Sequence, residues 1–585
     1  MHTPGTIFRD KFNDGDAVGG AGSRQTIVLE GAKKQRNDLI RGRLVLISVV
    51  FLAIFGAIGF RLTTLASTPY QQGPKIAGTS NTLMTARPDL VDRNDEVMAK
   101  DLTTFSLHAN PKKVAYPAEV VDQLATVIPD LDRKKILRRL KGDSRFVWIK
   151  RELTPAHHQR ILDLGIPGLE FHRETRRFYP GGSIASHIVG HVNIDNQGIA
   201  GFEKFVDDSG LADLHDVGFA TNARLEPVQL SVDMRVQHVV RDELAKAMQR
   251  YKAIAAVGII MNAKTGEVVA MSSLPDYDPN NPQSSLTTNA INRATAGVFE
   301  MGSTFKSITT AMALDSGAVD MTDRLDATNP IRVGRFTIRD FHAKKRVLSV
   351  PEVFIYSSNI GTAKMALKVG IENHQAFLER LGLLAAADHE LPEIGKPLSP
   401  KEWKQLSSIT ISFGHGVSVT PLQTLSAAAS LLNGGKLIPP TFQPRTVEAA
   451  NALAKQVVSP ETSDNMRYLF RLNVEKGSGR RADVNGYYVG GKTGTAEKVV
   501  NGRYSSDKKL NSFLSAFPSH DPEYVMLVMI DEPQPLEGQR AATAGLNAAP
   551  TTAAIIRRVA TTLGVAPRFD DERQPIDVKF RSAGQ

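Results

Sequence analysis

The chain has 585 residues, enough for more than one domain, and 42% of them are hydrophobic, which supports a globular core. It contains no cysteine, so disulfides, thiolate metal sites and a cysteine nucleophile are excluded. The formal charge of +10 comes from basic residues spread along the chain, without zinc-ligand spacing or aromatic-interleaved basic runs. We therefore expect a solvated basic surface and no nucleic-acid partner.

The first predicted element is a membrane anchor. Residues 44–60 are almost entirely apolar, and at about 1.5 Å per residue they just reach across a hydrocarbon core. Basic residues cluster before this run, whereas Lys75 is the only charged residue over residues 62–86. The positive-inside rule then predicts a cytoplasmic tail over residues 1–43 and a single transmembrane helix over 44–62. A cleaved signal peptide is the rival interpretation, but the long polar tail favours a retained anchor.

Composition divides the rest of the chain into four parts. Residues 63–85 are rich in Ser, Thr, Gly and Asn and are predicted to be a tether. Residues 86–227 mix short strands and helices with many charges and end in a linker-like segment, which indicates an N-terminal α/β pedestal module. Residues 228–565 show a denser strand and helix pattern and are the predicted main domain, and residues 566–585 are a predicted loose tail.

Local patterns in the main domain predict its architecture. A long amphipathic helix is followed by two apolar, β-prone runs within residues 255–272, which indicate a hairpin. Thr420, Pro421 and Gln423 form a predicted helix start with a capping box, and the helix is expected to run to Gly434. The apolar run 523–530 predicts a buried strand. Strands at both ends of the domain indicate an α+β fold, an antiparallel sheet covered by helices.

The first element with catalytic chemistry is Ser303-Thr304-Phe305-Lys306, which begins a helical pattern after Gly302. Positions i and i+3 share a helix face, so the Ser303 hydroxyl and the Lys306 amine can meet. A lysine is a base toward serine only if burial lowers its pKa. The positive end of a helix favours both a neutral lysine and a developing oxyanion. Alone, the tetrapeptide is equally compatible with a cap serine beside a surface lysine.

Two further elements contain hydroxyls, an amide and a lysine. Ser357-Ser358-Asn359 interrupts an apolar run at a predicted loop–helix junction, which alone would be an ordinary helix cap. Lys492-Thr493-Gly494-Thr495 follows a β-prone run, and the missing side chain at Gly494 would let a substrate backbone lie alongside. Alone, this segment could be an edge strand with a protective lysine.

Together and in this order, the three elements resemble the signature of the penicillin-binding transpeptidases: Ser-x-x-Lys, Ser-x-Asn and Lys-Ser/Thr-Gly. The segments 292–303 and 413–423 are similar to that family as well. Three upstream segments resemble the motifs of the class B N-terminal, dimerisation-like module, and nothing there resembles a glycosyltransferase domain. These segments are Arg87 with Asp92-Arg93-Asn94, Arg177-Phe178-Tyr179-Pro180, and Gly198-Ile199-Ala200-Gly201-Phe202-Glu203.

The chain departs from the family pattern at three positions. Pro88 and Asp95 stand where glycine is frequent, and Met301 stands where proline is frequent. We expect Arg87, Arg177 and Glu203 to form a buried charge network that joins the module to the main domain. Direct substrate contact by these three residues is the less favoured alternative.

The resemblance implies a role for each site residue. Ser303 would be acylated by the penultimate D-alanine of a peptidoglycan stem peptide, Lys306 would be the general base, and Ser357 would relay a proton. Asn359 would position Lys306 and the substrate, and Lys492 would supply positive potential. Substrate-binding residues would be Thr493, Gly494 and Thr495, with the oxyanion hole made by the backbone N–H groups of Ser303 and Thr495. No metal or organic cofactor is implied, and β-lactams would trap the same serine.

The resemblance further implies a class B D,D-transpeptidase, closer to the division (FtsI-like) type than to the elongation type. Such an enzyme would lie in the inner membrane with a periplasmic catalytic domain, at the septum, beside an FtsW-like glycosyltransferase and other division proteins. An elongation-type enzyme and a β-lactam sensor without turnover remain the alternatives. A β-lactamase is disfavoured because the class A deacylating glutamate motif is not recognisable, and an inactive scaffold because the motifs are intact.

Overall fold

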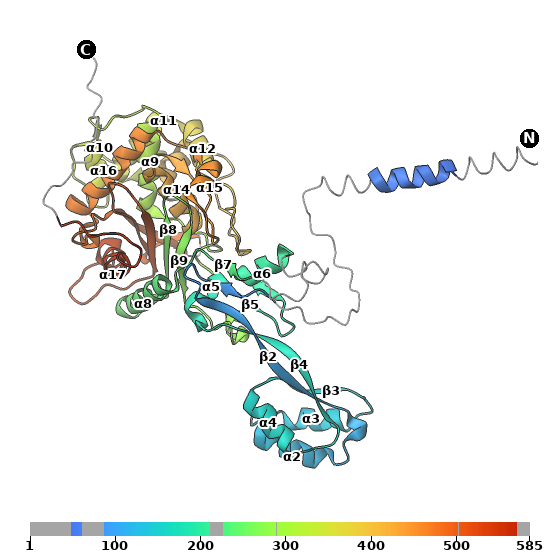
Figure 1. The fold of residues 1–585 in the computed structure, drawn as a ribbon. Coiled ribbons are helices and arrows are strands. Elements are labelled where there is room, and N and C mark those ends of the chain that lie inside the picture. The colour runs from blue at the N-terminus through green and yellow to red at the C-terminus, as the bar shows by residue number, and fades with distance from the viewer. Residues whose placement is uncertain (1–47, 61–86, 211–225, 288, 501, 570–585) are drawn as a thin grey trace, which may run out of the picture. The chain divides into compact units, whose positions relative to one another are not determined.

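The computed structural model describes residues 48–60, 87–210, 226–287, 289–500 and 502–569 (Figure 1). The chain divides into two compact units, Met1–Asn81 and Thr82–Gln585. The predicted tail and tether, most of the predicted linker and residues 570–585 lie outside the described residues.

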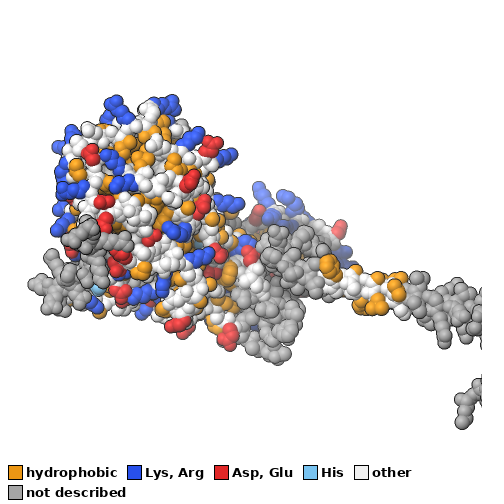
Figure 2. All heavy atoms as spheres, turned by 90° about the horizontal axis from the view of Figure 1, so that it is seen from above, with side chains coloured by type: hydrophobic (Ala, Val, Ile, Leu, Met, Phe, Trp, Pro, Cys, Tyr) orange, Lys and Arg blue, Asp and Glu red, His pale blue; other side chains and the backbone are white. Residues whose placement is uncertain are grey.

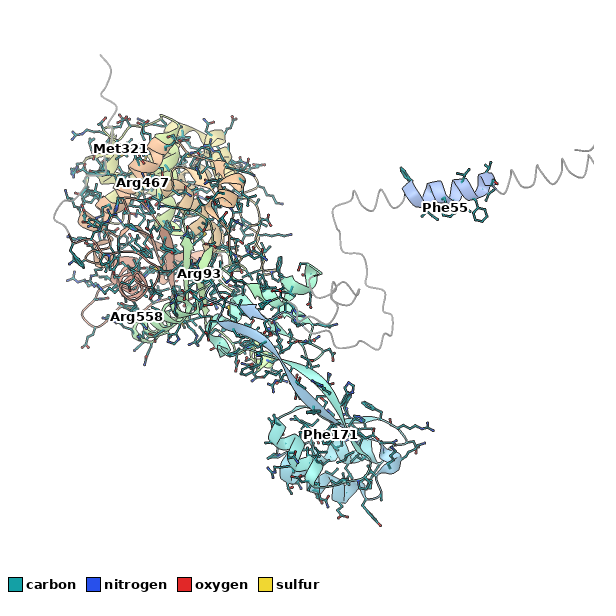
Figure 3. The ribbon with its side chains drawn as sticks, in the orientation of Figure 1. Phe55, Arg93, Phe171, Met321, Arg467 and Arg558 are labelled. Carbon is teal, nitrogen blue, oxygen red and sulfur yellow. The ribbon has the colours of Figure 1, made fainter. Side chains whose placement is uncertain are left out.

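In the first unit the described part is a helix over residues 48–60, and its large apolar side chains are exposed (Figure 2). Phe55 stands out from this helix (Figure 3). None of the helices in the described ranges combines the length and the apolar character needed to cross a membrane. Both ends of the predicted anchor lie outside these ranges.

A five-stranded antiparallel sheet forms the centre of the C-terminal part of the second unit, in the order β16-β17-β18-β8-β9. Its strands are β8 (Ala255–Asn262), β9 (Val268–Leu274), β16 (Gly490–Val500), β17 (Arg503–Phe517) and β18 (Tyr524–Asp531). The predicted hairpin is confirmed as β8 and β9, and the predicted buried strand is confirmed as β18. Strand β18 pairs with β8 along its whole length, so the two ends of the main domain meet inside one sheet.

Helices cover both faces of this sheet, so its strands are apolar on both sides. In β18, Val525 and Leu527 face one hydrophobic core, whereas Met526 and Val528 face the other. This double burial explains the continuous apolar run in the sequence. Helices α8 (Met234–Tyr251) and α17 (Ala548–Val559) pack on the second face.

The first face carries helices that either begin at the Ser303 and Ser357 motifs or pack against those that do (Figure 1). These are α9 (Phe305–Asp315), α10 (Val350–Ile355), α11 (Asn359–Val369), α14 (Pro421–Leu432) and α16 (Pro460–Lys476). Smaller elements of the same domain are α12 (Ile371–Arg380), α13 (Gln405–Ser412), α15 (Val447–Leu453), β10 (Arg324–Asp326), β11 (Ile331–Val333), β12 (Phe336–Ile338), β13 (Val347–Ser349), β14 (Lys436–Leu437) and β15 (Lys455–Gln456).

The buried helix α14 starts as predicted. Thr420 Oγ1 accepts from the Gln423 backbone N–H, and Gln423 Oε1 accepts from the Thr420 backbone N–H, both at 3.1 Å. This capping box satisfies two amides that the helix leaves unpaired. The helix ends at Leu432, just before Gly434 at a φ of +90°.

The N-terminal part of the second unit is built on strand β2 (Val97–Ala109). It pairs antiparallel with β1 (Leu90–Val91), β3 (Val147–Leu153) and β4 (Leu169–Phe178), and β1 pairs in parallel with β7 (Val228–Gln229). Helices α2 (Pro117–Val127), α3 (Arg133–Leu140) and α4 (Pro155–Asp163) form a separate core with β3 and the end of β2. Short elements follow: α5 (Ser186–Val189), β5 (His191–Val192), β6 (Gly198–Ala200) and α6 (Gly201–Asp208).

The expected charge network is present and buried. The Glu203 carboxylate accepts from Arg87 Nε at 2.9 Å and from Arg177 Nε at 2.7 Å, and the side chains of both Arg177 and Glu203 are 0% exposed. Arg177 also reaches Asp101, and Arg87 reaches the Asn196 carbonyl. All of these partners belong to the N-terminal module. The prediction that this network joins the module to the main domain was therefore wrong.

The neighbouring Asp92-Arg93 segment makes one of several contacts that join the two parts, together with hydrogen bonds such as those between Tyr179 and Asn280. The Met234 backbone N–H at the start of α8 donates to Asp92 Oδ2 at 2.9 Å, and the Arg93 N–H donates to the Val232 carbonyl at 2.9 Å. Asp95, one of the departures from the family pattern, has a φ of 63°. The turn thus keeps the left-handed geometry that glycine favours, which aspartate tolerates better than most residues.

Candidate active site

Ser303 lies in the 3-10 turn Gly302–Thr304 that leads into α9. The turn is held by two other segments. The Gly302 N–H donates to the Gly414 carbonyl at 3.2 Å, and a Cβ at Gly302 would lie 3.1 Å from the Thr495 carbonyl oxygen of β16. Gly302 also has a φ of +54°, which favours glycine. Ser303 is therefore fixed between strand β16 and the loop that contains Gly414.

Three motifs meet at one hydroxyl group. Lys306 Nζ donates to Ser357 Oγ at 3.0 Å and also to the Ser357 carbonyl, and Lys492 Nζ donates to the same Oγ at 3.0 Å. Both lysines are buried, at 1% and 0% exposure. The structure thus brings together Lys306, Ser357 and Lys492, which are far apart in the sequence. Among the described contacts, the hydrogen bonds of the Lys306 amine go to Ser357 rather than to Ser303.

The surroundings of these amines favour their neutral forms. Burial lowers the pKa of Lys306 well below its usual value, the positive charge of Lys492 lowers it further, and Asp340 opposes the shift. Burial lowers the pKa of Lys492 to about 7. Desolvation penalises a cation because the low-dielectric interior solvates it poorly. An uncharged Lys306 is what a general base toward serine requires.

The Ser-x-Asn segment is held in place by a carboxylate that the sequence did not reveal. Ser358 caps α11, and its hydroxyl donates to Asp340 Oδ2 at 2.7 Å. Asp340 Oδ1 accepts from the Ile360 N–H at 2.9 Å. Ser357, directly before the cap, has a φ of 55°, so its backbone is in the left-handed region. Asp340 lies in a loop without any recognisable spacing to the motif, and only the folded chain identifies it.

The structure changes the role expected for Asn359. Its side-chain amide nitrogen donates to the Arg339 carbonyl at 2.8 Å. The contacts expected between Asn359 and Lys306 are made by Ser357 instead. Asn359 therefore ties the segment to the loop at residue 339 and lies beside the site without holding the base.

Strand β16 divides its residues between two environments. Lys492 points toward Ser357, whereas Thr493 Oγ1 lies 2.6 Å from Ser478 Oγ and Thr495 Oγ1 accepts from the Ala544 N–H at 3.2 Å. Ser478 was not found by sequence reasoning, because a serine after a helix has no distinctive pattern. The strand is at the edge of the sheet, so one side of its backbone has no neighbouring strand.

Gly494 has a different function from the one predicted. A Cβ at this position would lie 2.5 Å from Ser512 Oγ and 2.8 Å from both the Met301 carbonyl oxygen and Thr304 Cγ2. The space beside Gly494 is therefore filled by the turn that carries Ser303. The glycine permits close packing of the turn that carries Ser303 on the strand, and the expectation of room for a substrate at this Cβ was wrong.

Comparison with known proteins agrees with this geometry. The family model of the penicillin-binding protein transpeptidase domain matches residues 256–557, and that of the penicillin-binding protein dimerisation domain matches residues 83–208. The chain belongs to the class B penicillin-binding transpeptidases. It is 37% identical to the probable peptidoglycan D,D-transpeptidase FtsI of Caulobacter vibrioides, covering 91% of this chain and 90% of that protein. It is 32% identical to the probable transpeptidase PenA of Neisseria meningitidis, covering 84% and 88%, and 29% identical to FtsI of Escherichia coli, covering 83% and 84%.

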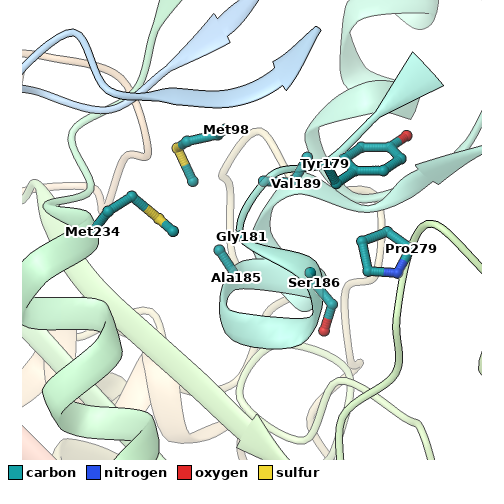
Figure 4. A pocket seen from close by; sticks show the side chains of 9 residues that line it. Met98, Tyr179, Gly181, Ala185, Ser186, Val189, Met234 and Pro279 are labelled. Atoms are coloured by element: carbon teal, nitrogen blue, oxygen red, sulfur yellow. The ribbon is translucent and has the colours of Figure 1, made fainter.

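As a penicillin-binding transpeptidase, the chain is a serine-type acyltransferase. The described part of the chain contains no group of three or more His, Asp or Glu side chains placed to hold a metal. A small, mostly apolar pocket lies where the N-terminal module meets the start of α8, with Met98, Tyr179 and Met234 in its lining (Figure 4). None of the three transpeptidase motifs contributes to that pocket.

Proposed function

We propose that this penicillin-binding transpeptidase cross-links peptidoglycan stem peptides through an acyl-enzyme on Ser303. The observation that carries the proposal is the convergence of Lys306 and Lys492 on the Ser357 hydroxyl, with Lys306 one helical turn after Ser303. The relatives named peptidoglycan D,D-transpeptidases cover nearly the whole chain, which supports the substrate class.

In the first half-reaction, neutral Lys306 takes the proton of the Ser303 hydroxyl, and the oxygen attacks the carbonyl carbon of the penultimate D-alanine. The backbone N–H groups of Ser303 and Thr495 stabilise the oxyanion. The terminal D-alanine leaves with a proton relayed through Ser357. Lys492 supplies positive potential, and Thr493 binds the terminal carboxylate.

In the second half-reaction, the amine of a neighbouring stem peptide attacks the ester carbon. A C–N bond forms, and the bond between that carbon and Ser303 Oγ breaks. A β-lactam reproduces the donor of the first half-reaction, but its ring-opened product blocks the second, so it inhibits the enzyme covalently.

Labelling with a fluorescent penicillin tests the nucleophile. Ser303→Ala is expected to abolish labelling, whereas Ser316→Ala, at the other end of α9, is expected to label like the unmodified protein. Labelled Ser303→Ala would refute the assignment. Release of cross-linked product from lipid-linked glycan strands distinguishes the enzyme from a β-lactam sensor, which acylates but does not turn over.

We further propose that residues 44–62 anchor the protein in the cytoplasmic membrane, with the N-terminus in the cytoplasm and the catalytic domain in the periplasm. The apolar run, the basic residues before it and the exposed apolar side chains over residues 48–60 support this topology. Protease treatment of spheroplasts is the test. The domain after residue 86 is expected to be digested and the tail before residue 44 protected, and a protected catalytic domain would overturn the topology.

A role at the division septum, beside an FtsW-like glycosyltransferase and other division proteins, completes the proposal. It is supported by the relatives named FtsI and by threonine as the second residue of Lys492-Thr493-Gly494-Thr495. A fluorescent fusion in the native host is expected to concentrate at mid-cell. Labelling of the lateral wall without septal enrichment would favour the elongation-type alternative.

A further inference from the structure

A second group of polar side chains meets the turn that carries Ser303. Glu300 lies just before the turn, and His415 follows Gly414, whose carbonyl accepts from the Gly302 N–H. Tyr504 comes from β17. Glu300 Oε1 accepts from the Tyr504 hydroxyl at 3.1 Å and from the Gly416 N–H at 2.7 Å. The His415 and Tyr504 rings lie 5.5 Å apart, edge to face.

Two buried polar atoms of this group lack a good hydrogen bond within the described part of the protein. Over the described residues, Glu300 Oε2 is buried without a hydrogen-bond partner, and His415 Nδ1 is buried without a partner of good geometry, although the Phe413 backbone lies close enough to raise the pKa of His415. An unpaired buried carboxylate oxygen costs free energy unless a ligand satisfies it. A carboxylate oxygen accepts only, so its natural partner is a donor, and a cationic donor fits best.

The proposed reaction needs such a ligand near Ser303. The acceptor of the second half-reaction is an amine, which arrives in water mainly as an ammonium ion. An ammonium cannot attack a carbonyl, because its nitrogen has no free electron pair. It must first lose a proton to a base near the acyl-enzyme.

We propose that Glu300 and His415, supported by Tyr504, receive the acceptor amine: Glu300 attracts the ammonium and the His415 imidazole takes its proton. This inference rests on the proposed function. The ammonium gives one proton to His415, and the neutral nitrogen attacks the ester carbon of acylated Ser303. As the C–N bond forms and the C–Oγ bond breaks, the second proton passes to Ser303 Oγ through Lys306.

The charges around His415 suit this role. Burial lowers the pKa of His415, so the imidazole is neutral and able to accept a proton near neutral pH. Glu300, Glu497 and the Phe413 backbone raise this pKa, but burial outweighs them and the net shift of the pKa is downward. Tyr504, whose pKa is raised by burial and by Glu300, remains a neutral hydrogen-bond donor.

The test uses the full-length protein in detergent with an acyl-D-alanine thioester as donor and a D-amino acid as acceptor. The measured quantity is the ratio of aminolysis to hydrolysis of the acyl-enzyme. This ratio counts only protein that has folded and acylated. We expect His415→Gln to lower it about 100-fold, and Glu300→Gln to raise the acceptor concentration needed for half-saturation about tenfold. His238→Gln, the same change on the exposed face of α8, is expected to leave the ratio unchanged.

Hydroxylamine as a second acceptor separates proton transfer from packing. Hydroxylamine is unprotonated at neutral pH and needs no base. With this acceptor, the ratio of aminolysis to hydrolysis in His415→Gln should therefore equal that of the unmodified protein. An unchanged ratio with the D-amino acid in both variants would overturn the proposal, and so would an equal loss with both acceptors. Failure of the unmodified protein to form any acyl-enzyme would instead contradict the proposed function.

Discussion

Lys306 and Lys492 each place a side-chain nitrogen 3.0 Å from the same uncharged oxygen, Ser357 Oγ. Two ammonium groups so close together in a buried site would repel each other strongly. The site therefore favours at most one positive charge, which leaves a neutral amine for Ser303.

Lys492→Met removes one of the two charges but keeps a long side chain. Because the Lys492 charge lowers the pKa of Lys306, its loss raises that pKa. Acylation needs neutral Lys306, so the rate increases as pH rises through this pKa. We expect the acidic limb of the acylation profile to move to higher pH, as measured by the second-order rate constant for a fluorescent penicillin. A limb that moves to lower pH would contradict the electrostatic role.

Asp340→Asn should move the same limb in the opposite direction. The Asp340 charge raises the pKa of Lys306, so removing it lowers that pKa and preserves neutral amine in more acidic solution. The asparagine oxygen can still accept from the Ile360 N–H, which limits structural damage. Asp326→Asn, a change at an exposed aspartate, is the control and should not shift the limb. Movement of both Lys492→Met and Asp340→Asn in one direction would refute the charge-based explanation.

Two substitutions at Ser357 separate its hydroxyl from its backbone. Both Ser357→Ala and Ser357→Gly remove the hydroxyl proposed to relay the proton, and we expect acylation to slow about 100-fold or more in each. A φ of 55° is strained for a residue with a Cβ but not for glycine. Ser357→Gly should therefore be more stable than Ser357→Ala by about 1 kcal/mol. Thermal unfolding of both variants measures this difference, and equal stability would show that the backbone conformation costs nothing.

Gly494→Ala should displace the proposed nucleophile, Ser303, without altering any of the proposed catalytic side chains. The new methyl group would meet the Met301 carbonyl at 2.8 Å, so the turn that carries Ser303 must move. We expect acylation to fall at least about tenfold, since small displacements of reacting groups are costly. Gly142→Ala, whose Cβ would lie 3.3 Å from one carbonyl oxygen, is the control and should acylate normally. A normal rate in Gly494→Ala would show that the strand and turn can separate freely.

Glu203→Gln should destabilise the N-terminal module. It leaves Arg87 and Arg177 buried without their shared carboxylate, and removal of one partner from a buried pair costs about 3–5 kcal/mol. Denaturant unfolding followed by near-ultraviolet circular dichroism measures the loss. Glu170→Gln breaks the exposed Lys113–Glu170 pair and should stay within about 0.5 kcal/mol of the unmodified protein. Equal effects of the two substitutions would mean that burial of the network contributes nothing.

Structural features that are determined by short sequence patterns could be predicted. The capping box at Thr420 and Gln423, the β8–β9 hairpin and the doubly buried strand β18 follow from short patterns whose physical cause lies within a few residues. The three catalytic motifs were recognisable because the chemistry requires fixed residue types at fixed spacing.

Features that depend on folding were not predictable. Asp340 and Ser478 reach the site from segments without a pattern, so only the tertiary structure reveals them. The packing role of Gly494 depends on which turn lies above it, and sequence shows a glycine but not its neighbour. Lys306 was expected to contact Asn359, but it contacts Ser357. The left-handed backbone of Ser357 places both its hydroxyl and its carbonyl within hydrogen-bond distance of the Lys306 amine.

The parallel pairing of β1 with β7 has a consequence for the order in which this protein folds. Strand β1 needs Val228 and Gln229 as partners, and Asp92 needs the Met234 N–H, which lies 142 positions later. A chain made from its N-terminus therefore cannot complete the sheet of the pedestal until the first turn of α8 exists. Contacts of such long sequence separation form slowly, because the entropic cost of closing the loop comes before any stabilisation by the contact. The N-terminal module and the catalytic domain are thus expected to mature together, and a fragment that ends before Val228 is expected to lack a finished sheet.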